Sequence, residues 1–349
     1  MIESSKHPKN KTQNNPKKTK QNISKVIEDI ETIKKTEESE KALRPKTIEE
    51  YVGQEGLKKQ LNLILSSANI RQVMPEHLLF YGPAGLGKTT IANLIANEIN
   101  ANFKVITASS LQRVGDIVAL LSNLEDRTVL FIDEIHRLKA PLEESLYSAM
   151  EDQTIDILIG KGTGATTLRI DLPNITIVGA TTLVGRLSKP LRDRFASTFQ
   201  LELYSIPELI KIINNSSTKL GVNIAEELTT NIASKGRGTP RIVNNITKRL
   251  LDYKIVNKVE EFDMQTLEVF LSDLGLYEYG LMKSDIKYLR SLERSQLSLK
   301  TLAGVLMEEI ETIEQVIEPY LLYLGFIAKD SNGRKITHRG VSFLESIAH

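Results

Sequence analysis

Between residues 43 and 203, short apolar runs alternate with amphipathic stretches. Apolar runs at 77–81, 103–107, 129–132 and 175–179 have the length and composition of buried strands. A helical pattern at 56–68 precedes the first of these runs, and others, such as 91–96, lie between them. Strands that alternate with helices predict an α/β domain, with a parallel sheet covered by helices on both faces.

A different pattern interrupts this domain at residues 154–172. Apolar and polar residues alternate with period two in 155–157 and in 168–172, on either side of the glycine-rich segment 160–164. Two alternating runs around such a turn predict a β-hairpin. We expect it to be inserted into the α/β domain and to protrude from it.

The strand signal fades after residue 204. Segments 207–220, 224–234, 241–257 and 264–274 predict an all-α bundle. From about residue 276, three helical stretches precede two short strands around residues 330–333, which is the order of a winged helix-turn-helix. We therefore predict an α/β domain at 41–203, a helical domain at 204–275 and a winged helix at 276–349.

The first forty residues differ from the rest. Residues 1–22 are rich in Lys, Asn, Gln and Thr and almost free of apolar side chains, so residues 1–40 are predicted to be a disordered tail. A weak DNA-tethering role for its lysines is the alternative.

Bulk composition narrows the functional classes. The formal net charge of +1 excludes a globally basic nucleic-acid coat, but not a local basic patch. The absence of cysteine excludes disulfides and thiolate metal sites. With no apolar run long enough to span a bilayer and no signal-peptide pattern, we expect a cytoplasmic protein.

The most specific chemical signal is Gly82-Pro83-Ala84-Gly85-Leu86-Gly87-Lys88-Thr89-Thr90. It fits G-x-x-x-x-G-K-[ST], the P-loop, and lies between a predicted strand and a predicted helix. In such a loop, backbone amides surround the phosphates, Lys88 reaches the β- and γ-phosphates and the Thr89 hydroxyl binds Mg²⁺. A chance glycine turn is the alternative, but the strand–loop–helix context favours nucleoside triphosphate binding.

A second signal is the apolar run 129–132, which ends in Asp133 and Glu134. Ligands bind at the carboxyl ends of parallel strands. Adjacent strand residues point to opposite faces, so the two acids have different tasks. Asp133 is placed to hold Mg²⁺ through water and Glu134 to polarise the attacking water. Solvated acids at an ordinary strand end would be the better interpretation without the P-loop.

Three further candidates follow along the chain. Thr182 ends another apolar strand, Arg194 lies in Leu191-Arg192-Asp193-Arg194-Phe195, and Arg241 follows Gly238-Thr239-Pro240 at the start of a helix. Phosphoryl transfer depends on positioning and charge neutralisation, so arginines near the γ-phosphate suit the chemistry. Taken singly, each arginine is more often a surface charge.

The chain resembles the AAA+ ATPases in the order of its motifs. The P-loop comes first, followed by the strand that ends in Asp-Glu, the strand that ends in Thr, and the two arginines. The strings Leu130-Phe131-Ile132-Asp133-Glu134-Ile135-His136-Arg137-Leu138 and Pro190-Leu191-Arg192-Asp193-Arg194-Phe195 narrow the resemblance to the RuvB family. The resemblance runs from about residue 42 to the C-terminus. It implies an AAA+ P-loop domain, an all-α lid and a C-terminal winged helix.

The resemblance also implies a function. Family members are ATP-driven motors of Holliday-junction branch migration, which form homohexameric rings around duplex DNA. Their inserted hairpin, matched here by 154–172, docks the junction-binding partner RuvA. Glu134 would be the catalytic base, Thr182 sensor 1, and Arg194 the arginine finger supplied to the neighbouring subunit. The nucleotide and its Mg²⁺ would be held by residues of four groups: Leu43, Arg44, Tyr51 and Val52 at adenine; Gly85, Gly87, Lys88, Thr89, Thr90 and Asp133 at phosphates and metal; Glu151, Asp152 and Gln153 near the nucleotide; Tyr204 and Arg241 at the lid.

The chain departs from the family pattern at several positions. Ala84 replaces the usual second proline of the P-loop, and Gln153 replaces an aromatic residue, so that a stacking role there is not expected.

Two other functions stay open: a clamp-loader or initiator-like ATPase switch, and a module that binds nucleotide but hydrolyses little. Glu134 and Arg194 argue against the module that only binds nucleotide. The hairpin and the winged helix argue against the clamp-loader-like switch.

DNA contact is predicted at the wing. The expected recognition helix, 309–324, carries Glu309, Glu311, Glu314 and Glu318, and such acids repel phosphate. Lys329 and Arg334, with Lys335 and Arg339 nearby, would instead contact the DNA backbone without reading sequence. A winged helix that serves only protein contacts is the alternative.

Overall fold

The computed structural model describes residues 43–159, 166–259 and 261–347. The predicted tail, 1–40, and the turn of the predicted hairpin, 160–164, lie outside the described residues. The chain divides into two units after Arg44, and the sheet and helices belong to the unit from Pro45 onward. Within the described residues, no helix is both long and apolar enough to cross a membrane.

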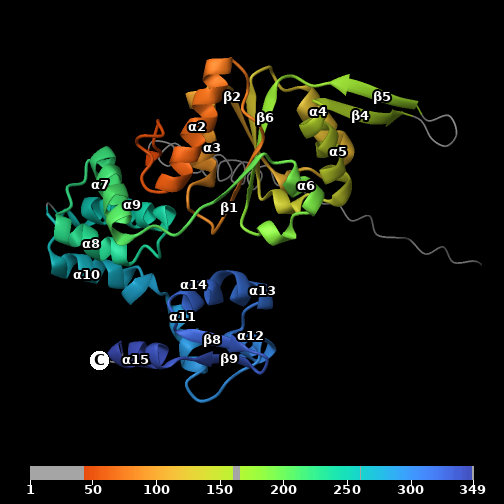
Figure 1. Cartoon of the computed structure of the whole chain (residues 1–349). Coiled ribbons are helices and arrows are strands. Elements are labelled where there is room, and N and C mark those ends of the chain that lie inside the picture. The colour runs from red at the N-terminus through yellow and green to blue at the C-terminus, as the bar shows by residue number, and fades with distance from the viewer. Residues whose placement is uncertain (1–42, 160–165, 260, 348–349) are drawn as a thin grey trace, which may run out of the picture. The chain divides into compact units, whose positions relative to one another are not determined.

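A five-stranded sheet with the order β2-β3-β6-β1-β7 forms the centre of the first domain (Figure 1). All of its strand pairs are parallel, which confirms the predicted α/β class. The order places β6 between β3 and β1, although β6 comes last of the three along the chain. The strands are β1 (Leu78–Tyr81), β2 (Asn102–Thr107), β3 (Thr128–Asp133), β6 (Ile175–Thr181) and β7 (Ser197–Gln200).

Helices cover both faces of the sheet because successive strand side chains point to opposite sides. Leu78 and Phe80 pack in a core with α2 and α3, whereas Leu79 packs in a second core with α4, α5 and α6. Figure 1 shows the two groups of helices on either side of the strands. The helices are α2 (Glu55–Arg71), α3 (Lys88–Glu98), α4 (Val114–Ser122), α5 (Ala140–Glu151) and α6 (Lys189–Asp193), with short 3₁₀ turns η1 (Ala108–Ser110), η2 (Ile135–Arg137) and η4 (Val184–Arg186).

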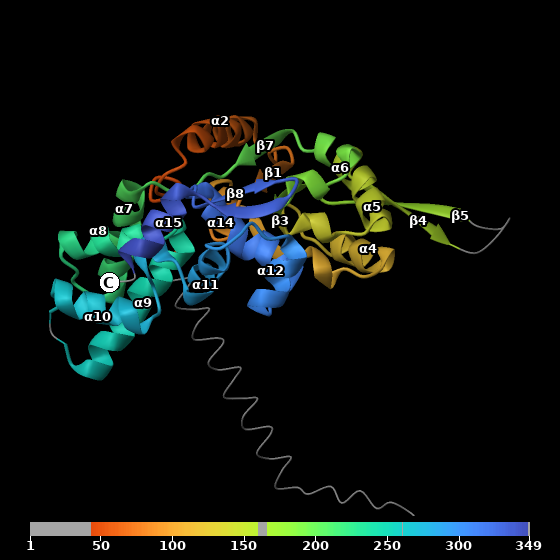
Figure 2. The same cartoon turned by 90° about the horizontal axis from the view of Figure 1, so that it is seen from below.

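The predicted hairpin is present. Strands β4 (Thr154–Ile159) and β5 (Thr166–Asp171) pair antiparallel, from Thr154 opposite Asp171 to Ile159 opposite Thr166. The Leu172 N–H closes its base by donating to the Gln153 carbonyl over 2.8 Å. Figure 2 shows the hairpin projecting away from α5 and the sheet.

Four helices follow the sheet, as predicted: α7 (Ile206–Leu220), α8 (Glu226–Ser234), α9 (Pro240–Asn257) and α10 (Met264–Asp273). Ser205 begins α7 with a capping box that involves Glu208, and Gly221 ends it with φ 68°. The apolar core of these helices is continuous with that of α2, α3 and one sheet face. The lid helices therefore pack onto the P-loop side of the sheet.

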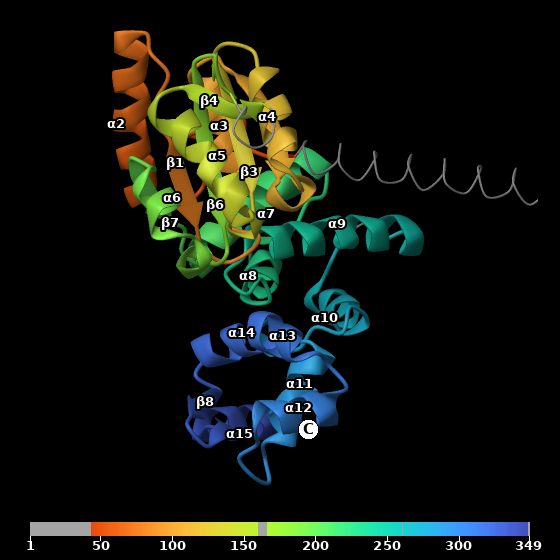
Figure 3. The same ribbon diagram turned by 90° about the vertical axis from the view of Figure 1, so that its right-hand side faces the viewer.

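The last part of the chain has its own apolar core. Figure 3 shows β8, α14 and α15 grouped with α11 and α12. The predicted recognition helix 309–324 is wrong as one continuous α-helix, because residues 313–317 are π-helical. Pro319 cannot donate the backbone hydrogen bond that would continue an α-helix here. The elements are η5 (Glu278–Gly280), α11 (Lys283–Ser291), α12 (Leu299–Leu306), α13 (Ile310–Thr312), η6 (Ile313–Ile317), α14 (Glu318–Tyr323), β8 (Ile327–Asp330), β9 (Gly333–Ile336) and α15 (His338–Ser346).

Candidate functional site

The strand order brings three predicted groups to one edge of the sheet. Tyr81, at the end of β1, pairs with Thr181 at the end of β6, and Ile132 of β3 pairs with Gly179 of β6. Because β6 is the middle strand, its carboxyl end lies between the P-loop and the acids that follow β3. Thr182 is thus placed between Lys88 and Glu134 by topology alone.

The P-loop backbone has the conformation that its glycines allow. Gly85 and Gly87 have φ of 82° and 99°, in the region that side chains rarely adopt. A Cβ on Gly87 would lie 2.9 Å from the Tyr51 hydroxyl, and one on Gly85 would lie 2.7 Å from Thr239 Cγ2. Helix α3 begins at Lys88, so its free N-terminal amides face the loop, where an anion is stabilised.

Lys88 is buried and held within the loop. Its ammonium donates to the carbonyls of Gly82 and Pro83, over 2.7 and 2.9 Å. Burial lowers the pKa of Lys88, Glu134 and Asp133 raise it, and Arg241 lowers it. These four charged groups therefore share one site, with two cations facing two acids.

Asp133 and Glu134 differ in environment. Burial, and then the charge of Glu134, raise the pKa of Asp133. Glu134 lies just beyond the strand with φ 48°, a left-handed conformation that is uncommon for non-glycine residues. Its carboxylate accepts the backbone N–H of Thr182 over 3.2 Å and the Thr182 hydroxyl over 3.1 Å.

His136 is a further member of this site. Its Nδ1 lies 3.1 Å from Glu134 Oε2 and 2.8 Å from the Thr181 hydroxyl. Burial lowers the pKa of His136, against the raising effect of Glu134. An ionised carboxylate can only accept, so Nδ1 carries the proton in the neutral ring. The histidine is part of the string that carried the family resemblance, but nothing in its spacing signalled a contact with Glu134.

Two tyrosines support the P-loop from the side of the lid. The Tyr51 and Tyr204 hydroxyls lie 3.0 Å apart, and both donate to the Leu86 carbonyl, over 3.1 and 3.3 Å. Burial raises the pKa of Tyr204 to about 12 and also raises that of Tyr51. Tyr51 therefore holds the loop backbone, a contact that the predicted role at adenine did not include.

Arg241 brings the lid to the P-loop. Its backbone N–H donates to the Gly85 carbonyl over 3.4 Å, and its side chain packs beside Gly85. Pro240 occupies the first turn of α9, where its missing N–H costs nothing. The predicted sensor 2 residue is thus in contact with the loop that it was expected to face.

Arg194 forms an ion pair of 3.0 Å with Glu151, which the family resemblance had placed near the nucleotide. Arg194 follows α6 and Glu151 ends α5, on the sheet face opposite the lid helices. Asp152 and Gln153, also predicted near the nucleotide, are exposed. Among the described residues, neither these two nor Arg194 forms a hydrogen bond or an ion pair with the P-loop.

Some predicted ligands stay untested. Leu43 and Arg44 belong to the other unit of the chain. Thr89, Thr90 and Val52 are half-buried, and their predicted roles remain predictions.

The described residues contain no cluster of three His, Cys, Asp or Glu that could form an all-protein metal site. A P-loop site does not need one, because a hydroxyl, a carboxylate and phosphate oxygens suffice for Mg²⁺.

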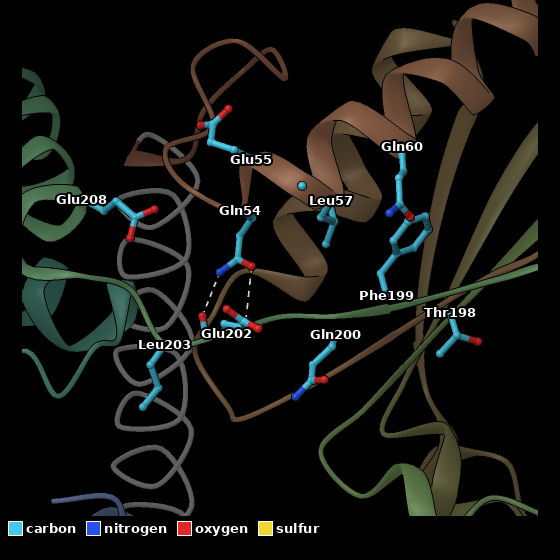
Figure 4. Close-up of a pocket in the computed structure, with 11 residues that line it drawn as sticks. Gln54, Glu55, Leu57, Gln60, Thr198, Phe199, Gln200, Glu202, Leu203 and Glu208 are labelled. Atoms are coloured by element: carbon cyan, nitrogen blue, oxygen red, sulfur yellow. Dashed lines mark hydrogen bonds between the residues drawn. The ribbon is translucent and has the colours of Figure 1, made fainter.

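A pocket of about 480 Å³ lies outside this constellation. Figure 4 shows it between the start of α2 and strand β7. Gln54 closes one end through hydrogen bonds with the Glu202 backbone, over 2.8 and 3.2 Å. Glu55 and Glu208 also line it, whereas no P-loop residue does. Its acids make it a poor site for a triphosphate.

Three family models match consecutive parts of the chain. The P-loop domain of the Holliday junction DNA helicase RuvB matches residues 43–201, the RuvB AAA lid domain matches 204–276, and the RuvB C-terminal winged helix domain matches 278–345. All three occur in the predicted order. The chain belongs to the RuvB family.

Individual relatives agree with this assignment. The Holliday junction branch migration complex subunit RuvB of Campylobacter fetus is 45% identical over 318 residues, which cover 90% of this chain and 93% of the relative. The corresponding subunit of Sulfurimonas denitrificans is 46% identical over 312 residues, with 88% and 93% covered. The solved structure of the Thermotoga maritima RuvB Holliday junction branch migration motor has a TM-score of 0.77 and 39% identity, covering 87% of this chain and 98% of that one.

The RuvB winged helix holds its two predicted DNA contacts in an ion-pair network. Glu318 is fully buried and accepts from Arg334 Nε over 2.8 Å, from Lys329 Nζ over 2.7 Å and from the Tyr288 hydroxyl over 2.9 Å. Burial raises the pKa of Glu318, but these hydrogen bonds outweigh it and leave the pKa lowered. The Arg334 side chain is 13% exposed and that of Lys329 37% exposed. Arg334 therefore has a structural task that the sequence did not signal.

Proposed function

We propose that this protein is an ATP-driven DNA motor that drives Holliday-junction branch migration in recombination and repair. The observation that carries the proposal is the full set of RuvB domains over residues 43–345, combined with an assembled P-loop site. Its relatives are named as subunits of the branch migration complex. The protein would work in the cytoplasm, where its DNA substrate is found.

ATP hydrolysis follows from the roles of a few side chains. Lys88 and the α3 amides bind the phosphates, and the P-loop glycines leave room for their close approach. Thr89 and Asp133 would hold Mg²⁺, which neutralises phosphate oxygens when bound. Glu134 takes the proton of the attacking water, and Thr182 orients the Glu134 carboxylate through its two hydrogen bonds.

The site is completed by a neighbouring subunit in a hexameric ring. Arg194 pairs with Glu151 of its own chain, whereas Arg241 acts electrostatically on Lys88. An arginine finger supplied in trans would stabilise the charge that develops on the γ-phosphate. Arg241 contributes from the lid of the same subunit. Subunit contact and ATP turnover are then coupled.

Duplex DNA would be held by the wing through its phosphates. Lys329 forms an ion pair with Glu318 but stays partly exposed. Lys335 and Arg339 are exposed nearby. Arg334 contributes mainly by supporting the wing, because its Nε pairs with Glu318 and its Nη2 with Glu314. Backbone contacts of this kind are independent of sequence and weaken steeply with salt.

A RuvA-like junction-binding protein would dock on the hairpin 154–172. The hairpin projects from the sheet domain, and among the described residues its two strands pair only with each other. An element that projects from its domain is available to a partner. Junction specificity would then come from the partner, while this chain supplies the ATPase.

The test is ATP-dependent dissociation of a synthetic four-way junction, measured with and without a RuvA-like protein. We expect dissociation that needs ATP and Mg²⁺ and is stimulated by the partner. Hydrolysis of ATP without dissociation under any condition would contradict the motor and favour a clamp-loader-like switch.

A further inference from the structure

Arg194 is held in one orientation by three groups of its own subunit. Its Nη1 donates to the Pro190 carbonyl over 2.8 Å, and its Nη2 lies 3.0 Å from a Glu151 oxygen. The guanidinium carbon lies 4.1 Å from the centre of the Tyr147 ring. Nε is buried without a hydrogen-bond partner. The side chain is 21% exposed, so only its tip reaches solvent.

We propose that Glu151 and Tyr147 are positioning residues for Arg194, which they hold ready for the ATP of the neighbouring subunit. The proposal rests on the proposed function, in which Arg194 acts in trans. It gives Glu151 a different task from the one that family resemblance implied, which was proximity to the nucleotide.

The hydrogen-bond inventory of the guanidinium supports this task. Of its five N–H groups, one is used by Pro190, one by Glu151, and the one on Nε is buried. One N–H remains on each terminal nitrogen, which is enough for a bidentate contact with phosphate. A free arginine side chain loses rotamer entropy when it is fixed. Fixing Arg194 beforehand removes that cost from the reaction.

Tyr147 acts on both the side chain and the backbone of the finger. Its ring supports the guanidinium face, which is a cation–π contact. Its hydroxyl lies 3.2 Å from Ser188 Oγ, and Ser188 accepts the Leu191 N–H at the start of α6. Arg194 directly follows helix α6. Tyr147 therefore contacts both the guanidinium and the residue that caps the preceding helix.

The charge of Glu151 also suits a contact with Arg194. The residue ends α5, two residues before the hairpin base, where Leu172 N–H bonds the Gln153 carbonyl over 2.8 Å. Beside a guanidinium, a carboxylate orients a charge of opposite sign.

The experiment compares variants in the assembled, full-length protein by steady-state ATPase activity, ATP affinity and sedimentation. Arg194→Ala sets the reference. We expect Glu151→Ala to lower kcat about 10- to 100-fold with unchanged ATP affinity, as a misplaced group does. Glu151→Gln keeps an acceptor and should lose less. Glu144→Gln, which removes an exposed acid from the same helix, should retain wild-type kcat.

Two further comparisons separate positioning from direct nucleotide contact. Adding Glu151→Ala to Arg194→Ala should lower kcat no further, because the finger is already absent. Mixing Glu151→Ala subunits with Lys88→Ala subunits should recover activity, since intact fingers then face intact P-loops. A further loss in the double variant, or no recovery at any mixing ratio, would overturn the proposal.

Variants of Tyr147 test the proposal independently of Glu151. Tyr147→Phe keeps the ring and should stay within a few-fold of wild type, whereas Tyr147→Leu should lose about as much as Glu151→Ala. Equal activity of the Phe and Leu variants would remove the ring from the proposal. Wild-type turnover by Arg194→Ala would instead contradict the proposed function, so the two failures are distinguishable.

Discussion

Thr182 holds the carboxylate of Glu134 through both its backbone N–H and its hydroxyl, over 3.2 and 3.1 Å. The two residues are 48 positions apart in the chain, and only the insertion of β6 between β1 and β3 makes them neighbours. A base must be within reach of its water and fixed in direction. The two hydrogen bonds from Thr182 fix the direction of the Glu134 carboxylate.

Replacing Glu134 with Gln should separate binding from turnover. The amide keeps an oxygen that can accept from Thr182, but it cannot take a proton from water. We expect ATP affinity close to wild type and a loss of kcat of about 10²–10⁴-fold. Fluorescent-nucleotide titration and phosphate release measure the two quantities. Turnover equal to wild type would refute Glu134 as the base.

Changing Thr182 tests orientation rather than proton transfer. Thr182→Val removes the hydroxyl while keeping shape and the backbone N–H bond, so we expect about a 10-fold lower kcat, the equivalent of one hydrogen bond. Thr182→Ser restores the donor and should recover most of the activity. Both variants should bind ATP normally. If Val and Ser behaved alike, the hydroxyl would have no part in orienting Glu134.

His136 should matter through its Nδ1 alone. His136→Asn can place an amide N–H near the position of Nδ1, whereas His136→Ala leaves Glu134 with Thr182 only. We expect Ala to lower kcat about 10-fold and Asn to lose less. Because burial holds the pKa of His136 below its usual value, the ring is neutral near pH 7. Any acid-side inflection of the kcat profile that comes from this ring should vanish in both variants.

Sequence reasoning predicted the elements well and the contacts between them less well. The P-loop and the Asp133-Glu134 strand end are local patterns, so their chemistry follows from adjacent residues. The contacts of His136 with Thr181 and of Tyr147 with Arg194 depend on strand order and helix packing, which no local pattern encodes. The π-helical turn at residues 313–317 differs, because Pro319 is visible in the sequence but does not by itself specify how the preceding turn relaxes.

The wing network predicts different effects for two cations only one residue apart. Arg334→Ala leaves the buried Glu318 with Lys329 and Tyr288 as partners, so we expect a loss of about 3 kcal/mol in stability, as for breaking a buried pair. Lys335→Ala removes an exposed lysine and should leave the melting temperature within about 1 °C, but reduce the salt slope of DNA binding by about one. Calorimetry and DNA titrations at several salt concentrations distinguish the two. A stable Arg334→Ala variant with weakened DNA binding would reverse the assignment.

His77 gives the sheet domain a pH-dependent stability. Its Nε2 donates to the Met150 carbonyl over 3.2 Å, and its Nδ1 accepts the Ile177 N–H over 3.0 Å, so the folded protein needs the neutral ring. Burial lowers the pKa of His77 below 6.5, although the Met150 contact raises it. The unfolded chain therefore takes up the proton first as pH falls. The His77 contribution is fully present above about pH 6.5 and is lost as pH falls toward the folded pKa, by at most about 1.4 kcal/mol per pH unit. Urea unfolding between pH 8 and pH 5 measures it. His77→Gln should be less stable at pH 8 and show a shallower decline than wild type; parallel curves would exclude His77 as the titrating group.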